Sequence, residues 1–130
     1  MMIKPLIKCL KKQLKKNNTV LHLAGLAHGN YTEQELNEVG HLGTLELAAA
    51  AAKAGVKRFV FISTVNVHGN MTSIAPFTEL SCIDNSVNLS KAKAEEGLKK
   101  IGKENSMEVT IIRPVLVYGK NAPGNFGLLS

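Results

Sequence analysis

Three short apolar runs, separated by two longer stretches with helical patterning, constrain the fold of this 130-residue chain most strongly. The runs are TVLHLAG at 19–25, VKRFVFIST at 56–64 and MEVTIIRPV at 107–115. The middle run is nearly continuous in β-branched and aromatic residues, which is typical of a strand covered on both faces. The order strand, helix, strand, helix, strand predicts a parallel α/β sheet with right-handed crossovers, in which the middle run lies between the other two.

The two helical stretches carry their own start and stop signals. Thr32 and Glu35 have the spacing of a capping box, and Gly55 supplies a C-terminal stop, so the first helix is expected over 32–55. A polar loop should follow the middle strand over 65–85, and the second helix is expected at about 86–103. Helices that cross over between parallel strands predict a three-layer arrangement around a small sheet.

The net charge of +6 is concentrated at the N-terminus, where six lysines fall within the first sixteen residues. Apolar residues recur there at three- and four-residue steps, which predicts a basic amphipathic helix over 1–17 ahead of a βαβαβ core at 18–130 in a single domain. A patch for nucleic acid or an anionic membrane is the alternative to a solvated helix face. Nucleic acid is not expected as a partner, because no aromatic residue lies between the lysines to stack on bases.

Cysteine usage and hydropathy exclude several classes of protein. Cys9 and Cys82 lie far apart without metal-ligand spacing, so neither a metal site nor a disulfide framework is expected. No apolar run reaches the roughly 18 residues of a membrane span, and the N-terminal stretch lacks the cleavage site of a secretory signal. A cytoplasmic location without a membrane partner is therefore expected.

Several segments occur in an order and at a spacing that a known family shares: VLHLAG, GTLELAAAAAKAGVKRFVFIST, PFTE, SKAKAE and IIRPVLVYGK. Together they resemble the extended short-chain dehydrogenase/reductase family, specifically its NAD-dependent nucleotide-sugar epimerases and dehydratases. The resemblance runs from about Thr19 to the C-terminus. It implies a partial Rossmann-type fold that lacks the first βαβ units, NAD or NADP as the cofactor, and a nucleotide sugar as the substrate.

The resemblance also implies roles for particular residues. Thr64 matches the family's catalytic Ser/Thr, and Lys91 matches the catalytic lysine, which also binds the nicotinamide ribose. The positions matched to ligands are Ala24, Gly25, Lys91, Pro114 and Val117 for the cofactor, and Asn125 for the diphosphate of the substrate. Each has an ordinary structural interpretation too, because a Ser-Thr pair ends many strands and a helical lysine is usually solvated.

The chain departs from the family's pattern in ways that put its activity in doubt. The family's tyrosine, four residues before the lysine, is replaced by Val87, and neither Tyr31 nor Tyr118 stands four residues before a lysine. The glycine-rich turn that binds the pyrophosphate is not found in these 130 residues. Gly40 stands where an asparagine is usual, and the first strand resembles the family's fourth. A truncated or degenerate member with little activity alone is therefore expected.

Two other functions remain open from the sequence. The chain could be a binding or assembly module that oligomerises, or complements a partner polypeptide, through the exposed edge of the first strand. It could instead be an enzyme that uses another base, with His41 and His68 as the candidates.

Overall fold

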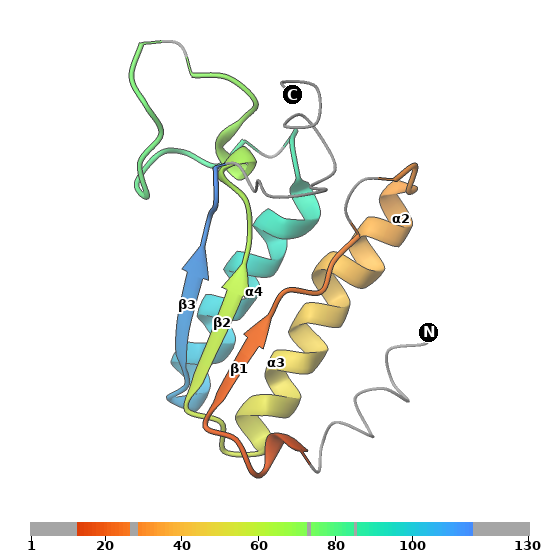
Figure 1. The fold of residues 1–130 in the computed structure, drawn as a ribbon, viewed down its shortest axis with the longest axis vertical. Helices are drawn as coiled ribbons and strands as arrows, with labels where there is room; N and C mark the ends of the chain where they lie inside the picture. The colour runs from red at the N-terminus through yellow and green to blue at the C-terminus, as the bar shows by residue number, and fades with distance from the viewer. Residues whose placement is uncertain (1–12, 27–28, 73, 85, 116–130) are drawn as a thin grey trace, which may run out of the picture.

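The computed structural model describes residues 13–26, 29–72, 74–84 and 86–115 of the chain (Figure 1). The strands are β1 (Thr19–His22), β2 (Arg58–Ile62) and β3 (Glu108–Ile112). The helices are α2 (Glu33–Leu36), α3 (Thr44–Lys53) and α4 (Leu89–Asn105), with a π-helical segment η1 (Asn37–Gly43) and a 3-10 turn η2 (Val65–His68). No described helix is long and apolar enough to cross a membrane.

The sheet is parallel, with the order β1-β2-β3. The predicted central position of the middle strand is thereby confirmed. Val20, Phe59 and Val109 lie side by side across the three strands. His22, Phe61 and Ile111 form the next row on the same face, because side chains alternate with a period of two along a strand.

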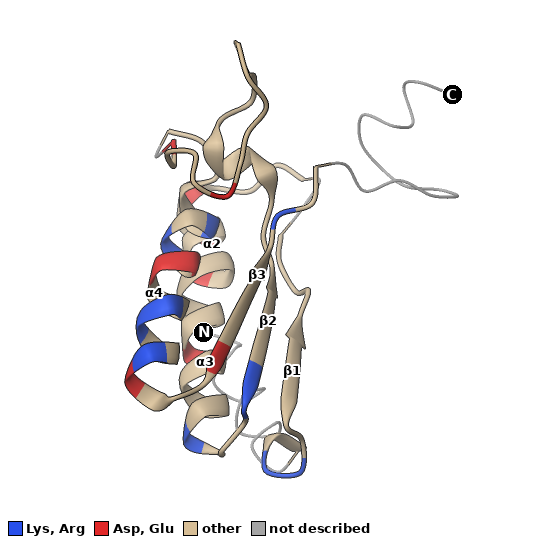
Figure 2. Ribbon diagram, turned by 90° about the vertical axis from the view of Figure 1, so that its left-hand side faces the viewer, with Lys and Arg blue, Asp and Glu red and all other residues tan. Residues whose placement is uncertain are grey.

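The described helices all lie on one face of the sheet (Figures 1 and 2). Phe59 and Phe61 point into this layer and are buried against the helices in one apolar core, together with Ala48, Ala51, Ala94 and Leu98. The predicted α/β class with a Rossmann-type parallel sheet is confirmed. The part of the chain that the structure describes contributes two layers, the sheet and this helical layer.

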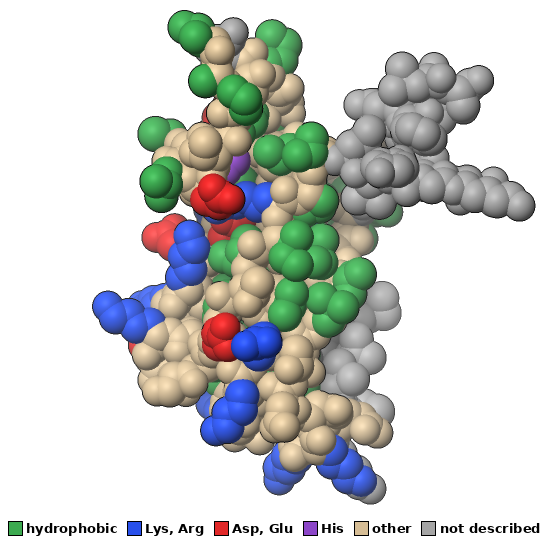
Figure 3. Space-filling model, turned by 60° about the vertical axis from the view of Figure 1, so that its left-hand side comes forward, with side chains coloured by type: hydrophobic (Ala, Val, Ile, Leu, Met, Phe, Trp, Pro, Cys, Tyr) green, Lys and Arg blue, Asp and Glu red, His purple; other side chains and the backbone are tan. Residues whose placement is uncertain are grey.

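The opposite side of the sheet carries apolar side chains that no described helix covers. We call it the open face and define it by Leu21, Val60, Ile62 and Ile112, which alternate with the helix-facing residues. Leu21 is 57% exposed and Ile112 is 45% exposed. Figure 3 shows hydrophobic side chains gathered on this side of the molecule. The sequence predicts a sheet that is buried on both faces, and the described residues cover one of the two.

The first helical stretch begins as predicted but is not a single α-helix. The capping box is present: the Glu35 amide donates to Thr32 Oγ1 over 3.2 Å, and the Thr32 amide donates to Glu35 Oε2 over 2.8 Å. The helix is continuous as predicted, but between α2 and α3 it changes to the π-helical segment η1. The Thr44 hydroxyl donates to the Gly40 carbonyl over 2.9 Å at the junction with α3. Glycine weakens an α-helix, so the two glycines of this segment favour such a local departure.

The second helix begins three residues later than predicted, at Leu89. Asp84 Oδ1 accepts hydrogen bonds from both the amide and the hydroxyl of Ser86, which stabilises a turn in place of a helix. Asn88 then takes a left-handed conformation, with φ of 48°. Polar side chains that bond their own backbone compete with a helix start in this way. Val87 therefore precedes the helix rather than lying on it.

Candidate functional site

The carboxyl ends of the strands meet at one edge of the sheet, where ligands of open parallel sheets bind. Helix α4 begins at this edge (Figure 1). The Lys91 Nζ donates to the carbonyl of Ile62, the last residue of β2, over 3.2 Å. It also lies 5.4 Å from the centroid of the Phe61 ring. The predicted lysine is thus placed at the strand ends.

Gly25 lies beside this amine. A Cβ atom at Gly25 would lie 3.9 Å from Lys91 Nζ, and nothing else among the described residues would lie within 4 Å of it. Gly25 and Ala24 are both exposed. The backbone that follows β1 is therefore open to a ligand that approaches the lysine, as glycine at this position permits.

Thr64 follows β2 in extended conformation and is partly buried. Its Oγ1 accepts a hydrogen bond from the Asn66 amide over 3.3 Å, so the hydroxyl caps η2. The next amide, that of Val65, donates to the carbonyl of Pro114 over 3.1 Å. Thr64 and Pro114 are therefore neighbours at the strand ends. Val117, Asn125 and Tyr118 lie outside the described residues.

Val87 stands where the family resemblance implies an acid/base group, and its side chain cannot supply one. Its amide donates to the Asp84 carbonyl over 3.2 Å, and its side chain is partly buried. Tyr31 precedes α2, far from Val87 along the chain, and is 40% exposed. The described residues include no other tyrosine. Among the described residues, no tyrosine therefore lies within one helical turn before Lys91 in the sequence.

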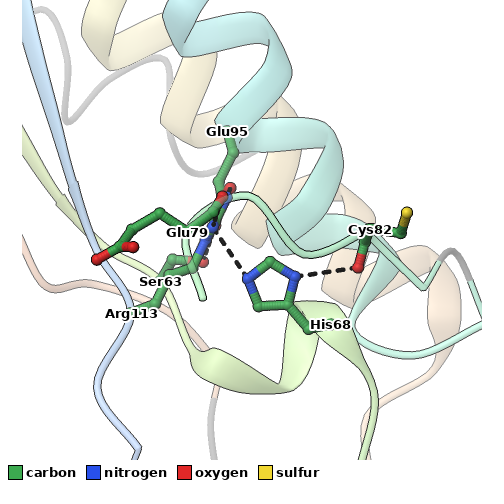
Figure 4. A network of polar contacts seen from close by, with 6 residues as sticks. All are labelled: Ser63, His68, Glu79, Cys82, Glu95 and Arg113. Atoms are coloured by element: carbon green, nitrogen blue, oxygen red, sulfur yellow. Dashed lines mark hydrogen bonds and ion pairs between the residues drawn. The ribbon is translucent and has the colours of Figure 1, made fainter. Parts of the chain in front are cut away.

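A buried polar network, shown in Figure 4, lies directly behind these residues. Glu95 is 2% exposed and accepts hydrogen bonds from the Ser63 hydroxyl and from two nitrogens of Arg113, at 2.5 to 3.0 Å. The bidentate pair is a charge-assisted interaction in a desolvated position. The network joins α4 to the ends of β2 and β3.

The network continues to His68. The Arg113 Nη1 donates to His68 Nε2 over 3.0 Å, so Nε2 is an acceptor and the proton lies on Nδ1. The Nδ1–H donates to the Cys82 carbonyl over 3.0 Å. Arg113 also donates to the Glu79 carbonyl over 3.5 Å. His68 is 8% exposed with both ring nitrogens engaged, which disfavours it as a catalytic base.

Three members of this network, Ser63, Glu95 and Arg113, are close in sequence to predicted site residues. Ser63 precedes Thr64, Arg113 precedes Pro114, and Glu95 lies one helical turn after Lys91. The ion pair and the Ser63 hydrogen bond therefore join the three segments that carry Thr64, Lys91 and Pro114. Sequence reasoning missed this role, although Glu95 falls at three-residue steps between Ala92 and Leu98 on the buried side of α4. A buried carboxylate requires a charged or hydrogen-bonding partner, so a glutamate on the apolar face of a predicted helix is the sequence signal for such a network.

The electrostatics of the site follow from burial and from this pairing. Burial lowers the pKa of the Lys91 amine, and the nearby Glu95 carboxylate opposes that effect. Burial alone would raise the pKa of Glu95, but hydrogen bonds from Arg113 and Ser63, with the charge of Arg113, lower it overall. The Glu95 hydrogen bonds raise the pKa of Arg113. Glu95 and Arg113 are thus held in their charged forms.

His22, at the end of β1, lies near Lys91, and the sequence analysis did not single it out. Its ring stacks on Phe61 with centroids 5.8 Å apart, and its Nε2 lies 3.0 Å from Thr44 Oγ1. The Thr44 hydroxyl proton is donated to the Gly40 carbonyl, so His22 Nε2–H is the donor to Thr44 Oγ1. Burial, and then the positive charge of Lys91, lower the pKa of His22. His22 is therefore a neutral, packed imidazole.

A pocket of about 570 Å³ opens between η1 and the start of α4. Its polar lining residues include Asn37, Asn88, Ser90, Lys91 and Lys93, and Leu26, Leu36 and Leu89 also line it. Within the described ranges, no group of three His, Cys, Asp or Glu side chains could hold a metal ion.

Comparison with known proteins agrees with this geometry. The sequence model of the NAD dependent epimerase/dehydratase family matches residues 6–128. The chain belongs to this family. The UDP-glucose 4-epimerase of Vibrio cholerae is 39% identical over 124 residues, which are 89% of this chain and 38% of that protein. The UDP-glucose 4-epimerase of Haemophilus influenzae is 36% identical over 119 residues, covering 85% of this chain and 34% of that protein.

Solved structures of family enzymes share the fold. The dTDP-glucose 4,6-dehydratase DesIV from Streptomyces venezuelae, a double mutant with NAD and DAU bound, gives a TM-score of 0.75 at 26% identity. A short-chain dehydrogenase/reductase superfamily protein from Agrobacterium tumefaciens with bound NAD gives 0.71 at 30% identity. Each alignment covers 82% of this chain and 34% of the other chain. This epimerase/dehydratase family chain thus spans little more than a third of the length of these relatives.

Proposed function

We propose that the chain forms the nicotinamide-facing side of an NAD-dependent nucleotide-sugar epimerase or dehydratase, and that these 130 residues alone have little activity. The observation that carries the proposal is the joint placement of Lys91, Gly25 and Thr64 at the strand ends, with Val87 where the acid/base group is required. The family membership and the NAD-bound structural relatives support the choice of cofactor.

The residues present fit a dinucleotide in one respect that can be tested. Gly25 leaves the space beside Lys91 Nζ free of a side chain, and the Lys91 ammonium is a donor suited to ribose hydroxyls. NAD, when bound, would supply the hydride acceptor for chemistry at a sugar carbon. The Thr64 hydroxyl would donate a hydrogen bond to the sugar oxygen at the same edge of the sheet. NADP is the alternative, because no described residue distinguishes the two cofactors.

What the chain lacks sets the expected rate. General acid/base catalysis contributes about 10²- to 10⁴-fold, or about 3 to 5 kcal/mol of the barrier, and Val87 cannot provide it. The glycine-rich phosphate turn is also not found in the 130 residues. Without that anchor, the nicotinamide would not be held against the substrate. Weak NAD binding and slow turnover follow from the two losses together.

The test is to titrate the purified chain with NAD and NADP and to assay UDP-sugar interconversion, with and without an added polypeptide that carries the family's first βαβ unit. We expect weak or undetectable binding by the chain alone and tighter binding with the added polypeptide. Lys91→Met should weaken the complemented binding, whereas Lys103→Met, an exposed control near the other end of the same helix, should not. Rapid turnover by the unmodified chain alone would overturn the proposal.

A second candidate function, assembly with itself or with a complementing polypeptide, is favoured by the open face. Leu21 and Ile112 are exposed on it, and within the described residues the outer edge of β1 has no strand beside it. Unpaired edges and apolar patches recruit partners. We expect sedimentation to show self-association at micromolar concentration, and Leu21→Gln with Ile112→Gln to reduce it. The matched control is Glu96→Gln, at an exposed position of α4. A stable wild-type monomer would exclude self-association.

A further inference from the structure

Residues 74–84 lie between η2 and the start of α4, and we call them the docked segment. Ile74 is 98% exposed and Leu80 is 95% exposed, so these large apolar side chains do not anchor the segment. The Asp84 amide donates to the Val67 carbonyl of η2 over 2.8 Å. The segment thus depends largely on polar contacts for its position, which favours local opening over a segment with a buried apolar face.

His68 supplies two further contacts to the docked segment (Figure 4). Its Nδ1–H donates to the Cys82 carbonyl over 3.0 Å, and its ring centroid lies 5.4 Å from that of Phe77. The same Arg113 Nη1 that donates to His68 Nε2 also donates to the Glu79 carbonyl over 3.5 Å. His68 and Arg113 together therefore connect the segment to the strand ends.

The contact between Arg113 and His68 requires a neutral imidazole. A guanidinium group is a donor only and keeps its proton in proteins, so Nε2 must be the acceptor. A ring with protons on both nitrogens would direct Nε2–H at Arg113 Nη1 from 3.0 Å and would place two positive charges side by side. Histidine is the side chain whose charge changes between about pH 5 and pH 8. Proton uptake by His68 and its contact with Arg113 therefore exclude each other.

Charged groups of both signs surround His68, which is 8% exposed. They are Glu79 and Asp84 on the docked segment, Glu95 and Lys99 on α4, and Arg113 after β3. The exposed Cys82 thiol points away from the ring (Figure 4). Because the two ring nitrogens contact Arg113 and the Cys82 carbonyl, no carboxylate of this set binds the ring directly. A second proton on the ring would thus face Arg113 without a carboxylate partner at Nε2.

We propose that His68 is a pH-sensitive switch for the docked segment. The neutral ring keeps residues 74–84 against the strand ends, and protonation of the ring releases them. Only the released form binds the second proton without facing Arg113, so acid favours release. The equilibrium constant for release should rise by up to about tenfold for each pH unit over which the released ring takes up its proton. Release opens the pocket of about 620 Å³ that the segment lines through Phe77 and Glu79.

The experiment is to measure amide hydrogen exchange by nuclear magnetic resonance at pH 7.5 and pH 5.5, corrected for the intrinsic exchange rates. The Asp84 amide reports release, and the Glu108 amide, which donates to the Lys57 carbonyl over 2.9 Å, reports the sheet. In the wild type, the ratio of Asp84 to Glu108 protection should fall by up to about tenfold at the lower pH. In His68→Gln it should stay constant, because an amide donates and accepts but does not titrate. His41→Gln, at another partly buried histidine, is the matched control and should behave as the wild type.

Nitrogen-15 chemical shifts of the His68 ring test the switch in the wild type, without a variant. At pH 7.5 the proton should be on Nδ1, and the midpoint of ring protonation should coincide with the midpoint of the loss of Asp84 protection. A proton on Nε2 at pH 7.5, separate midpoints, an unchanged protection ratio in the wild type, or an equal fall in His68→Gln would each overturn the proposal. These measurements need neither NAD nor a nucleotide sugar, so the switch and the proposed function can fail separately.

Discussion

Removing Arg113 should destabilise the fold far more than removing another arginine that forms an ion pair with a glutamate. In Arg113→Met the carboxylate of Glu95 would stay buried, at 2% exposure, with only the Ser63 hydroxyl as a hydrogen-bond partner. The matched control is Arg58→Met, because Arg58 pairs with Glu108 through the same chemistry between β2 and β3. The side chains of Arg113 and Glu95 are 16% and 3% exposed, against 52% and 61% for Arg58 and Glu108.

These exposures set the magnitudes. Breaking a buried pair by removing one partner costs about 3 to 5 kcal/mol, because an uncompensated charge is left behind. An exposed pair contributes about 0 to 1 kcal/mol. Domains of this kind unfold with about 5 to 15 kcal/mol, so Arg113→Met should remove a large part of the stability. Replacing both partners, as Glu95→Leu with Arg113→Met, should restore most of the loss.

Urea unfolding followed by far-ultraviolet circular dichroism is the appropriate assay, because the chain has no tryptophan. The cost of Arg113→Met should shrink between pH 7.5 and pH 5. Burial, no longer opposed by Arg113, would raise the pKa of Glu95 in the variant, so a proton could neutralise the buried carboxylate. Equal free energies of unfolding for Arg113→Met and Arg58→Met, or a cost that grows at low pH, would refute this reasoning.

Three further predictions concern single residues. The pKa of His22 lies below its ordinary 6.5, so the unfolded chain binds the proton at a higher pH than the folded chain. The free energy of unfolding should therefore fall as the pH drops below about 6.5. His22→Gln should flatten this pH dependence in urea titrations at several pH values. Gly55 has φ of +86°, so Gly55→Ala should cost about 1 kcal/mol in the same assay, and an unchanged midpoint would contradict the left-handed stop. A Cβ at Gly97 would lie 2.6 Å from Leu45 Cδ1, so Gly97→Ala should lower the free energy of unfolding by about 1 to 3 kcal/mol through overpacking, and the melting temperature with it. An unchanged melting temperature would show that Leu45 can move away freely.

The elements with strong local signals could be predicted from the sequence. The strand Arg58–Ile62 is apolar throughout after its first residue, and the capping box at Thr32 has a fixed spacing, so the sequence predicts both. The start of α4 was misplaced because Asp84 bonds to Ser86 and holds a turn, a competition that helix propensity does not register. The π-helical segment was not foreseen, since its geometry depends on packing between η1 and α4, where a Cβ at Gly40 would lie 3.2 Å from Ser90 Oγ.

The candidate site divides in the same way. Lys91 and Gly25 were found by their resemblance to a family motif, and the structure brings them to the same strand ends. The ion pair of Glu95 and Arg113 was missed because its partners are 18 residues apart and meet only when β3 packs beside α4. The open face is also a tertiary property: VKRFVFIST predicts burial on both sides, whereas the described helices cover only one.

The turnover ratio of Val87→Tyr to wild type, measured in the presence of a polypeptide that carries the family's first βαβ unit, tests the central claim most directly. The claim is that the strand ends retain Lys91 and Thr64 but lack an acid/base group. The account predicts that Val87→Tyr is about 10²- to 10⁴-fold faster in nucleotide-sugar interconversion under these conditions, and that neither protein turns over without the added polypeptide. Equal and rapid turnover by the wild type and Val87→Tyr would contradict it, because another group would then be acting as the base.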